Sequence, residues 1–266
     1  MPNTSIPKHK EFSDSLKKES NVDADSCDRK DQTDLRELLV NQGDIGLVHE
    51  IAVSEDQVGQ INGIGFDLDR KLMRSDGPFC GLGEMEPEEA YQEVVQGWLM
   101  NHPVLAKSEV RMSGGGLHLI LWLDEPIILD SCWQLDRWIK MIKVIQASLP
   151  IDPDQPGILM MTRPIDSVNS KNGKVVTQLK ESEPVTQDEI ESFVSEMMEH
   201  PFKTVMQILF GSERRTPCPI CGKEETHLSA GRGLQGHCYN ECGKVSLGDL
   251  YSTILLPREI RKGGTC

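Results

Sequence analysis

Two regions of the chain alternate apolar and polar positions and therefore predict strands. Residues 61–70 (INGIGFDLDR) place apolar side chains two positions apart, with polar or small ones between them. Residues 117–123 (LHLILWL) follow three glycines and put four leucines on one strand face, with His118, Ile120 and Trp122 on the other. This second region predicts a turn followed directly by a strand.

Helical periodicity is present in further segments. Residues 87–102 and 131–149 repeat apolar side chains at intervals of three and four, and the first of them has acidic residues in its opening turn. Another helix is predicted after Asp188, which we expect to be its N-cap. A linker helix over 203–210 is expected to end at Gly211. The apolar positions that carry these predictions are Val94, Val95, Trp98, Leu99, Leu135, Trp138, Ile139, Ile142, Ile145, Leu149, Ile190, Phe193, Val194 and Met197.

The order of these elements predicts one mixed core with a small module after it. Strands and helices alternate without an internal repeat, and a third short strand is expected at 174–178. This pattern predicts an α/β (α+β) core over residues 34–200, entered by a short helix at 34–41. Residues 1–33 are polar and are expected to form a disordered tail. Residues 201–266 are expected to hold the linker helix and a C-terminal module.

Composition and charge narrow the function classes. The chain has no apolar run of eighteen residues and no apolar segment in its polar N-terminal region, so we expect a cytoplasmic protein without a membrane partner. The net charge is -14, which lowers the expectation of tight non-specific DNA binding. The charge is uneven, because residues 203–266 carry nine basic and six acidic side chains; that balance of +3 leaves -17 for the remainder.

Four of the eight cysteines have a spacing typical of a zinc site, and in a reducing compartment such a cluster favours metal binding over disulfides. Four thiolates hold Zn²⁺ tetrahedrally and leave no open position, so the zinc is expected to be structural. His227 or His237 is an alternative to one of the thiolates. The expected ligands are Cys218, Cys221, Cys238 and Cys242.

Basic side chains and one tyrosine surround this cysteine set. Phosphate contacts together with base stacking would suit a single-stranded nucleic acid. A protein-docking module or a purely structural ribbon is the alternative. The residues concerned are Arg214, Arg215, Lys223, Arg232, Lys244 and Tyr239.

Asp67 and Asp69 are two positions apart in the first predicted strand. Residues so spaced share a strand face, so we expect the two carboxylates side by side. Like charges at that distance repel each other unless they are protonated or bridged by a cation, and oxygen ligands of this kind suit Mg²⁺ or Mn²⁺. Taken alone, the pair is more typical of a solvated strand face than of a metal site.

The segment SGGGLH, residues 113–118, joins a glycine turn to a histidine. Glycines allow a ligand to approach the backbone, and His118 enters the sheet where it would hydrogen-bond a phosphate or offset its charge. A histidine satisfied within the sheet is the common alternative. Further on, residues 149–174 offer Asp152 and Asp154 and then a basic, amide-rich loop, which would suit a metal and a triphosphate or a simple polar loop.

In this order the segments resemble the archaeo-eukaryotic primase superfamily, and more narrowly the primase-polymerase branch found in plasmids, phages and bacteria. The resemblance spans about residues 60–175, and SGGGLH is its most specific part. It implies a core with an RRM-like antiparallel or mixed sheet. It also favours nucleic-acid binding by the attached zinc ribbon.

Carried over by this resemblance, Asp67, Asp69 and Asp152 match the carboxylates that bind the catalytic Mg²⁺ or Mn²⁺ ions. Asp154 is a rival for the third position, because the spacing does not decide between them. His118 matches the histidine that contacts the phosphates of the incoming nucleotide.

Ser113 matches the small residue that opens the second motif. Arg163, Asn169 and Lys171 match a nucleotide-binding loop of the family. The chain departs from the family at residues 165–166, where Ile-Asp stands in place of a Pro-Gly pair.

The resemblance implies a DNA primase or primase-polymerase, a DNA-directed nucleotidyltransferase. It would make short RNA or DNA strands from nucleoside triphosphates on single-stranded DNA template by two-metal transfer, with any unwinding supplied by a separate replicative helicase. The main alternative is a catalytically weak, nucleic-acid-binding replication accessory protein of the same fold. A rolling-circle nicking nuclease ranks low, because the glycines are followed by HLI and not by a His-x-His pair.

Overall fold

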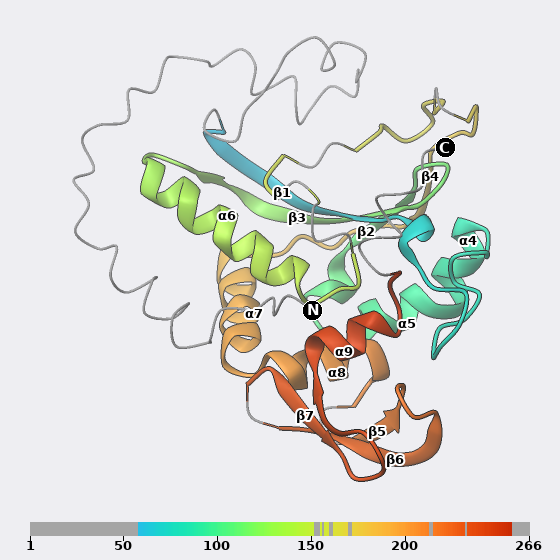
Figure 1. Cartoon of the computed structure of the whole chain (residues 1–266). Coiled ribbons are helices and arrows are strands. Elements are labelled where there is room, and N and C mark those ends of the chain that lie inside the picture. Colours follow the sequence, from blue (N-terminus) through green and yellow to red (C-terminus); the bar gives the residue numbers. More distant parts are fainter. Residues whose placement is uncertain are drawn as a thin grey trace.

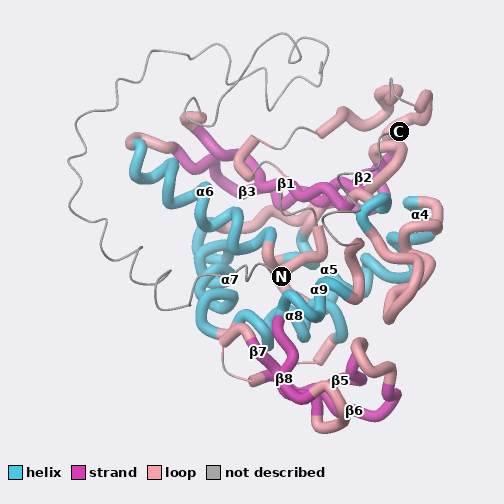
Figure 2. Tube along the Cα trace, in the orientation of Figure 1, coloured by secondary structure: helices cyan, strands magenta, loops and turns pink. Residues whose placement is uncertain are grey.

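The computed structural model describes residues 58–151, 155, 157–159, 162–169, 172–212, 215–231 and 233–256. A four-stranded sheet carries helices on one face, and a second four-stranded sheet lies beyond the helices, at the far end from the first (Figures 1 and 2). The predicted tail at 1–33 and the predicted helix at 34–41 lie outside the described residues.

The first sheet is antiparallel throughout, with the strand order β1-β3-β2-β4. An RRM-like sheet also contains the neighbouring strands β1-β3-β2, but its fourth strand lies beside β1. In this chain β4 pairs with β2 instead. The predicted antiparallel sheet is therefore confirmed, but its fourth strand lies at the β2 edge. The short strand predicted at 174–178 is this β4, which begins at Thr177. The strands are β1 (Gln60–Leu68), β2 (Glu109–Met112), β3 (Leu117–Ile128) and β4 (Thr177–Lys180).

Alternation along β1 and β3 separates a core face from an open face, as predicted. Ile64, Phe66 and Leu68 are at most 2% exposed, and the leucines at 117, 119 and 121 are at most 1% exposed. These apolar side chains meet the helical layer drawn beneath the sheet in Figure 1. Because side chains alternate between faces, Asp67 and His118 lie on the opposite, open side.

The predicted helices are present, with corrected ends. The N-cap of the helix predicted after Asp188 is Thr186, whose hydroxyl accepts from the Glu189 N–H at 3.1 Å while the Glu189 carboxylate accepts from the Thr186 N–H at 2.9 Å. This capping box leaves Asp188 in the first turn. A π-helical turn (Tyr91–Val95) joins α4 to α5. The helices are α4 (Pro87–Ala90), α5 (Gln96–Met100), α6 (Cys132–Gln146), α7 (Gln187–Glu199) and α8 (Pro201–Phe210).

Helix α8 packs the second sheet onto the first half of the molecule. Gly211 ends the helix in the left-handed conformation at φ +67°, as predicted. Phe202 is fully buried, and its ring lies so close to Gly236 that a Cβ at this glycine would overlap it. The segment is thus part of the core. The second sheet, called the ribbon below, consists of β5 (Arg215–Cys218), β6 (Lys223–Ala230), β7 (Gln235–Cys238) and β8 (Gly243–Ser246).

After the ribbon, helix α9 (Leu247–Ser252) leads the chain back to the end of β1. The Arg74 N–H donates to the Ile254 carbonyl at 2.7 Å, and the Leu256 N–H donates to the Leu72 carbonyl at 2.8 Å. One hydrophobic core contains buried residues of both sheets. Within the described part of the chain, no helix has both the length and the apolar character needed to cross a membrane.

Candidate functional site

One row of polar side chains crosses the open face of the first sheet. The backbone register pairs Asp67 on β1 with His118 on β3, then His118 with Arg111 on β2, and Arg111 with Gln178 on β4. Directly paired residues of antiparallel strands point to the same face. The Nε2 atom of His118 lies 4.0 Å from Oδ1 of Asp67. The sheet therefore brings two of the predicted site residues together.

The loop after α6 adds a third segment to this row. Oγ1 of Thr162 lies 3.0 Å from Nδ1 of His118, and the Arg163 carbonyl accepts from Nη1 of Arg111 at 3.0 Å. The loop runs along the open side of the sheet, opposite the helices (Figure 1). Three segments that are far apart in the sequence meet here, and each carries residues that the sequence singled out.

His118 is almost completely enclosed, with 6% of its surface exposed. Burial, and after it the charges of Arg163 and Arg111, lower the pKa of His118 to about 4. The imidazole is therefore neutral at pH 7, and its contact with Asp67 is not an ion pair. The ring acts as a hydrogen-bonding group, and the cations beside it are Arg163 and Arg111, the latter balanced by Glu109.

Arg111 is a candidate site residue that the sequence interpretation missed. Its guanidinium forms a salt bridge with Glu109, which is 4% exposed and also accepts from the indole N–H of Trp122 at 2.6 Å. The guanidinium carbon lies 6.0 Å from the centroid of the Trp122 ring. These contacts fix the arginine next to His118. A sequence signal existed, because Arg111 is two residues before Ser113 in a strand whose Val110 is buried.

The glycine turn packs closely against its neighbours at two of its three positions. A Cβ at Gly114, where φ is +103°, would lie 2.8 Å from Nδ2 of Asn169, and a Cβ at Gly116 would lie 2.7 Å from the Leu68 carbonyl. A Cβ at Gly115 would meet nothing within 4 Å. Gly115 thus has open space at its Cα, while its carbonyl accepts from Nε of Arg70 at 3.0 Å.

Ser113 and Asn169, both predicted site residues, hold the turn and the loop together. The Asn169 side-chain amide donates to the Ser113 carbonyl at 2.5 Å, and both residues are buried. The Ser113 hydroxyl donates to the Gly116 carbonyl at 3.4 Å, within the turn. In this structure the two residues shape the glycine turn.

Asp69 does not stand beside Asp67 on the strand, which corrects the expected pair. β1 ends at Leu68, and Asp69 caps the short 3₁₀ turn that follows, where its Oδ1 accepts from the Lys71 N–H at 3.0 Å. An aspartate at a strand end readily bonds the backbone two residues on, and this local bond determines its orientation here.

The described residues do not assemble the expected site for two divalent ions. Asp67, whose side chain is 46% exposed, faces His118. Among the described residues no group of three carboxylate, histidine or cysteine ligands gathers at this face. Three predicted site residues, Asp152, its rival Asp154, and Lys171, lie outside the described part of the chain.

The departure from the Pro-Gly pair leaves the turn in a glycine-like conformation. Asp166 has φ +66°, in the left-handed region that favours glycine. The Ser167 N–H donates to the Pro164 carbonyl at 3.3 Å, which closes the turn. Aspartate tolerates this region better than most residues. The loop therefore turns at Asp166 without a glycine.

The four predicted cysteines gather at one end of the ribbon, at the turns after β5 and β7. Their Sγ atoms all lie within 4.8 Å of one another, and the Cys218–Cys242 and Cys221–Cys238 pairs are each 3.9 Å apart. A tetrahedral zinc with ordinary Zn–S bonds needs sulfurs about 3.8 Å apart, so the set fits zinc. Among the described side chains the cluster contains cysteines alone, and His237 packs instead against Tyr239.

The surroundings of Cys221 favour a thiolate. Hydrogen bonds from the Lys223 backbone N–H, and then from the Asn240 side chain, lower the pKa of Cys221 to about 6. The Asn240 amide nitrogen lies 3.6 Å from this sulfur. A metal-binding thiol must be deprotonated, and Cys221 is the ligand that these donors favour in that form, whereas burial raises the pKa of Cys218 and Cys242.

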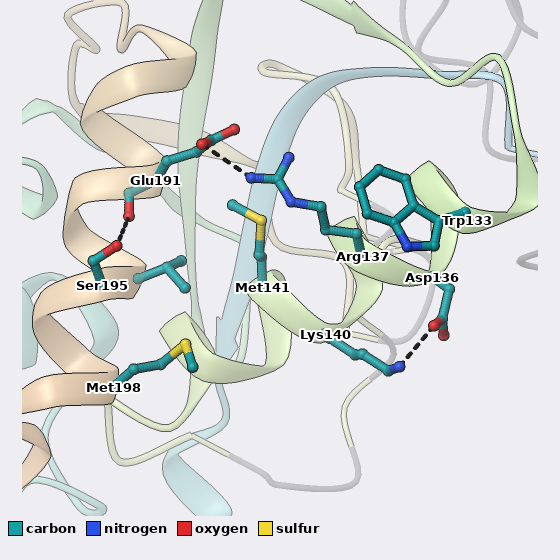
Figure 3. Close-up of a pocket in the computed structure, with 9 residues that line it drawn as sticks. Trp133, Asp136, Arg137, Lys140, Met141, Glu191, Ser195 and Met198 are labelled. Carbon is teal, nitrogen blue, oxygen red and sulfur yellow. Dashed lines mark hydrogen bonds and ion pairs between the residues drawn. The ribbon is translucent and has the colours of Figure 1, made fainter. Parts of the chain in front are cut away.

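A cavity of about 230 Å³ lies between α6 and α7, away from the row on the open face (Figure 3). Arg137 and Glu191 form an ion pair across it at 3.0 Å, and Trp133 at its edge is 55% exposed. None of the predicted site residues lines this cavity.

Comparison with known proteins gives one weak structural similarity. No family model and no curated protein matches the chain. Among solved structures, the fold is similar to the AEP domain (PP-N190) of the primase-polymerase (PrimPol) of cyanophage S-2L, with a TM-score of 0.35 and 16% sequence identity. The match covers 53% of this chain and 64% of that chain, so this chain spans less than two thirds of that domain. A similarity of this strength does not establish a family.

Proposed function

We propose that the chain is a primase-polymerase-type nucleotidyltransferase that joins nucleotides on a single-stranded DNA template. The main support is the meeting of three separate segments on the open sheet face, represented by Asp67, His118 and Thr162–Arg163. These are the segments that resemble primase-polymerase motifs in the sequence.

The chemistry of the row suits a nucleoside triphosphate. Arg163 supplies positive charge beside His118, Arg111 offers guanidinium N–H groups while Glu109 balances its charge, and the Cα of Gly115 faces open space. The salt bridge to buried Glu109 and the carbonyl of Arg163 fix the Arg111 side chain before any ligand arrives. Such preorganised cations stabilise the charge that develops on transferred phosphates. His118, neutral and held by Thr162, would orient one phosphate oxygen through a hydrogen bond.

A divalent ion, when bound, would supply charge neutralisation and activate the attacking hydroxyl. We propose Asp67 as one ligand of this ion, on the basis of the sequence resemblance; the described residues do not complete a ligand set around it. Asp152 or Asp154 is our proposal for the missing carboxylate, on the basis of the sequence resemblance alone. Zinc in the ribbon would be structural, because four thiolates leave no open position.

A synthesis assay tests the proposal. Zinc-loaded protein is incubated with single-stranded DNA, labelled NTPs or dNTPs, and Mg²⁺ or Mn²⁺. We expect products that lengthen with time in the wild type and in the control Asp130→Ala, an exposed aspartate outside the site, and none in Asp67→Ala. Product from Asp67→Ala at the wild-type rate, or none from any protein, would contradict the proposal.

The alternative is a binding protein of the same fold without synthesis. This alternative is favoured by Asp69, whose carboxylate caps a turn and so does not join Asp67 in the row. Of the two aspartates in the first motif, Asp67 alone then faces the row, whereas metal-dependent synthesis needs more than one carboxylate. The same assay distinguishes the two, because a binding protein would retain template DNA and yield no product with either metal.

A further inference from the structure

A second row of polar side chains crosses the exposed face of the ribbon. The register pairs Arg215 on β5 with Ser229 on β6, Ser229 with His237 on β7, and His237 with Lys244 on β8. Arg215, His237 and Lys244 are exposed, whereas Thr216, the next residue along β5, is buried on the other face. Three strand spacings separate the ends of this row, which is therefore about 14 Å long.

Tyr239 adds an exposed aromatic ring to the row. It begins the turn between β7 and β8, and 62% of its surface is exposed. The Arg215 guanidinium carbon lies 5.7 Å from the centroid of its ring. The His237 ring meets it edge to face, with centroids 4.8 Å apart and an interplanar angle of 73°. Aromatic and cationic side chains are thus interleaved on one short sheet face.

We propose that this ribbon row (Arg215, Ser229, His237 and Lys244, with Tyr239) binds single-stranded nucleic acid. Unpaired bases would stack on Tyr239 and His237, while Arg215 and Lys244 contact the flanking phosphates. The binding itself is independent of catalysis; only the identification of the bound strand as the template rests on the proposed function.

Charge and shape favour this partner over others. The chain carries -14 in total, whereas ribbon residues 215–246 hold four basic and three acidic side chains, a balance of +1, so the ribbon repels a polyanion less than the rest of the chain does. An acidic peptide would use the cations but would gain little from an exposed ring. Paired bases in a duplex are already stacked on one another and would leave Tyr239 unused.

Fluorescence anisotropy of labelled oligo-dT tests the row in the full-length, zinc-loaded protein, without triphosphates. Tyr239→Ala is compared with Tyr239→Phe, which keeps the ring. The double variant Arg215→Ala/Lys244→Ala is compared with Arg137→Ala/Lys143→Ala on α6, which removes the same charge elsewhere. Zinc content and thermal melting of each variant establish that it is folded.

We expect Tyr239→Ala to weaken binding at least about fivefold and Tyr239→Phe to leave it unchanged. The ribbon double variant should reduce the slope of log affinity against log salt by about 0.7 for each lost phosphate contact, and the α6 variant should leave it unchanged. Equal binding by Tyr239→Ala and wild type, an equal effect of the two double variants, or equally tight binding of duplex DNA or oligo-glutamate would overturn the proposal. Failed synthesis with intact oligo-dT binding would contradict the proposed function and leave the ribbon row standing.

Discussion

The three consecutive glycines allow a prediction in which neighbouring positions respond with opposite sign. In Gly114→Ala the new Cβ would lie 2.8 Å from the Asn169 amide at a backbone φ of +103°, which L-residues rarely adopt. In Gly116→Ala it would lie 2.7 Å from the Leu68 carbonyl, a backbone atom that cannot move cheaply. Each change is expected to lower the free energy of unfolding by about 1–3 kcal/mol.

Gly115→Ala is the matched control within the same turn. Its Cβ meets nothing within 4 Å and its φ is not positive, so the folded state should not be strained. Because alanine reduces the conformational freedom of the unfolded chain, the free energy of unfolding should stay the same or rise by about 0.4–1 kcal/mol. If a triphosphate lies against this backbone, the same methyl group should weaken its binding. Urea unfolding gives the stabilities, and titration with a fluorescent nucleoside triphosphate gives the affinities. Equal destabilisation by all three alanines would refute the described turn, and unchanged affinity in Gly115→Ala would remove this position from the site.

Three further predictions concern the loop, the ribbon and pH. Asp166→Gly should stabilise the protein by at most about 1 kcal/mol, because glycine accepts φ +66° without strain but also gives the unfolded chain more freedom; destabilisation by more than about 1 kcal/mol would contradict the turn. Chelating the zinc should unfold the ribbon, because about 10 kcal/mol or more of binding free energy is lost. The core should then melt at a lower temperature, since Phe202 of α8 packs against Gly236 of the ribbon. An unchanged melting curve after verified zinc loss would contradict this prediction. His118 has its pKa lowered from 6.5 to about 4 on folding, so the unfolded chain takes up the proton first as the pH falls. The free energy of unfolding should therefore fall as the pH drops from about 6.5 to 4, and should be about 2 kcal/mol lower at pH 5 than at pH 7.5. Urea unfolding at the two pH values measures this difference, and His118→Gln should abolish the contribution of this histidine.

Local patterns predicted the parts of the fold that depend on local periodicity. The alternation around Phe66 and the leucines of β3 determined which side chains face the core, and His118 was placed correctly on the other face. The spacing of the four cysteines predicted their cluster, because the turns after β5 and β7 are short and bring the sulfurs together by local geometry.

Features that depend on competing local bonds or on distant pairing were missed. Asp69 continues the alternation, but its bond to the Lys71 N–H turns the chain out of the strand. Thr186 with Glu189 carried a readable capping box that outweighs Asp188. Arg111 becomes a site residue only because β2 pairs with β3 opposite His118, and β4 joins β2 through contacts that no local pattern specifies.

The central claim is that the row from Asp67 to Arg111 receives a nucleoside triphosphate. An experimental structure with Mn²⁺ and a non-hydrolysable triphosphate tests it most directly, because the anomalous signal of manganese locates the ion without ambiguity. The account predicts a manganese peak beside the Asp67 carboxylate and phosphate density between the glycine turn, His118 and Arg111. Manganese or nucleotide bound elsewhere, with this face empty at saturating ligand, would contradict it.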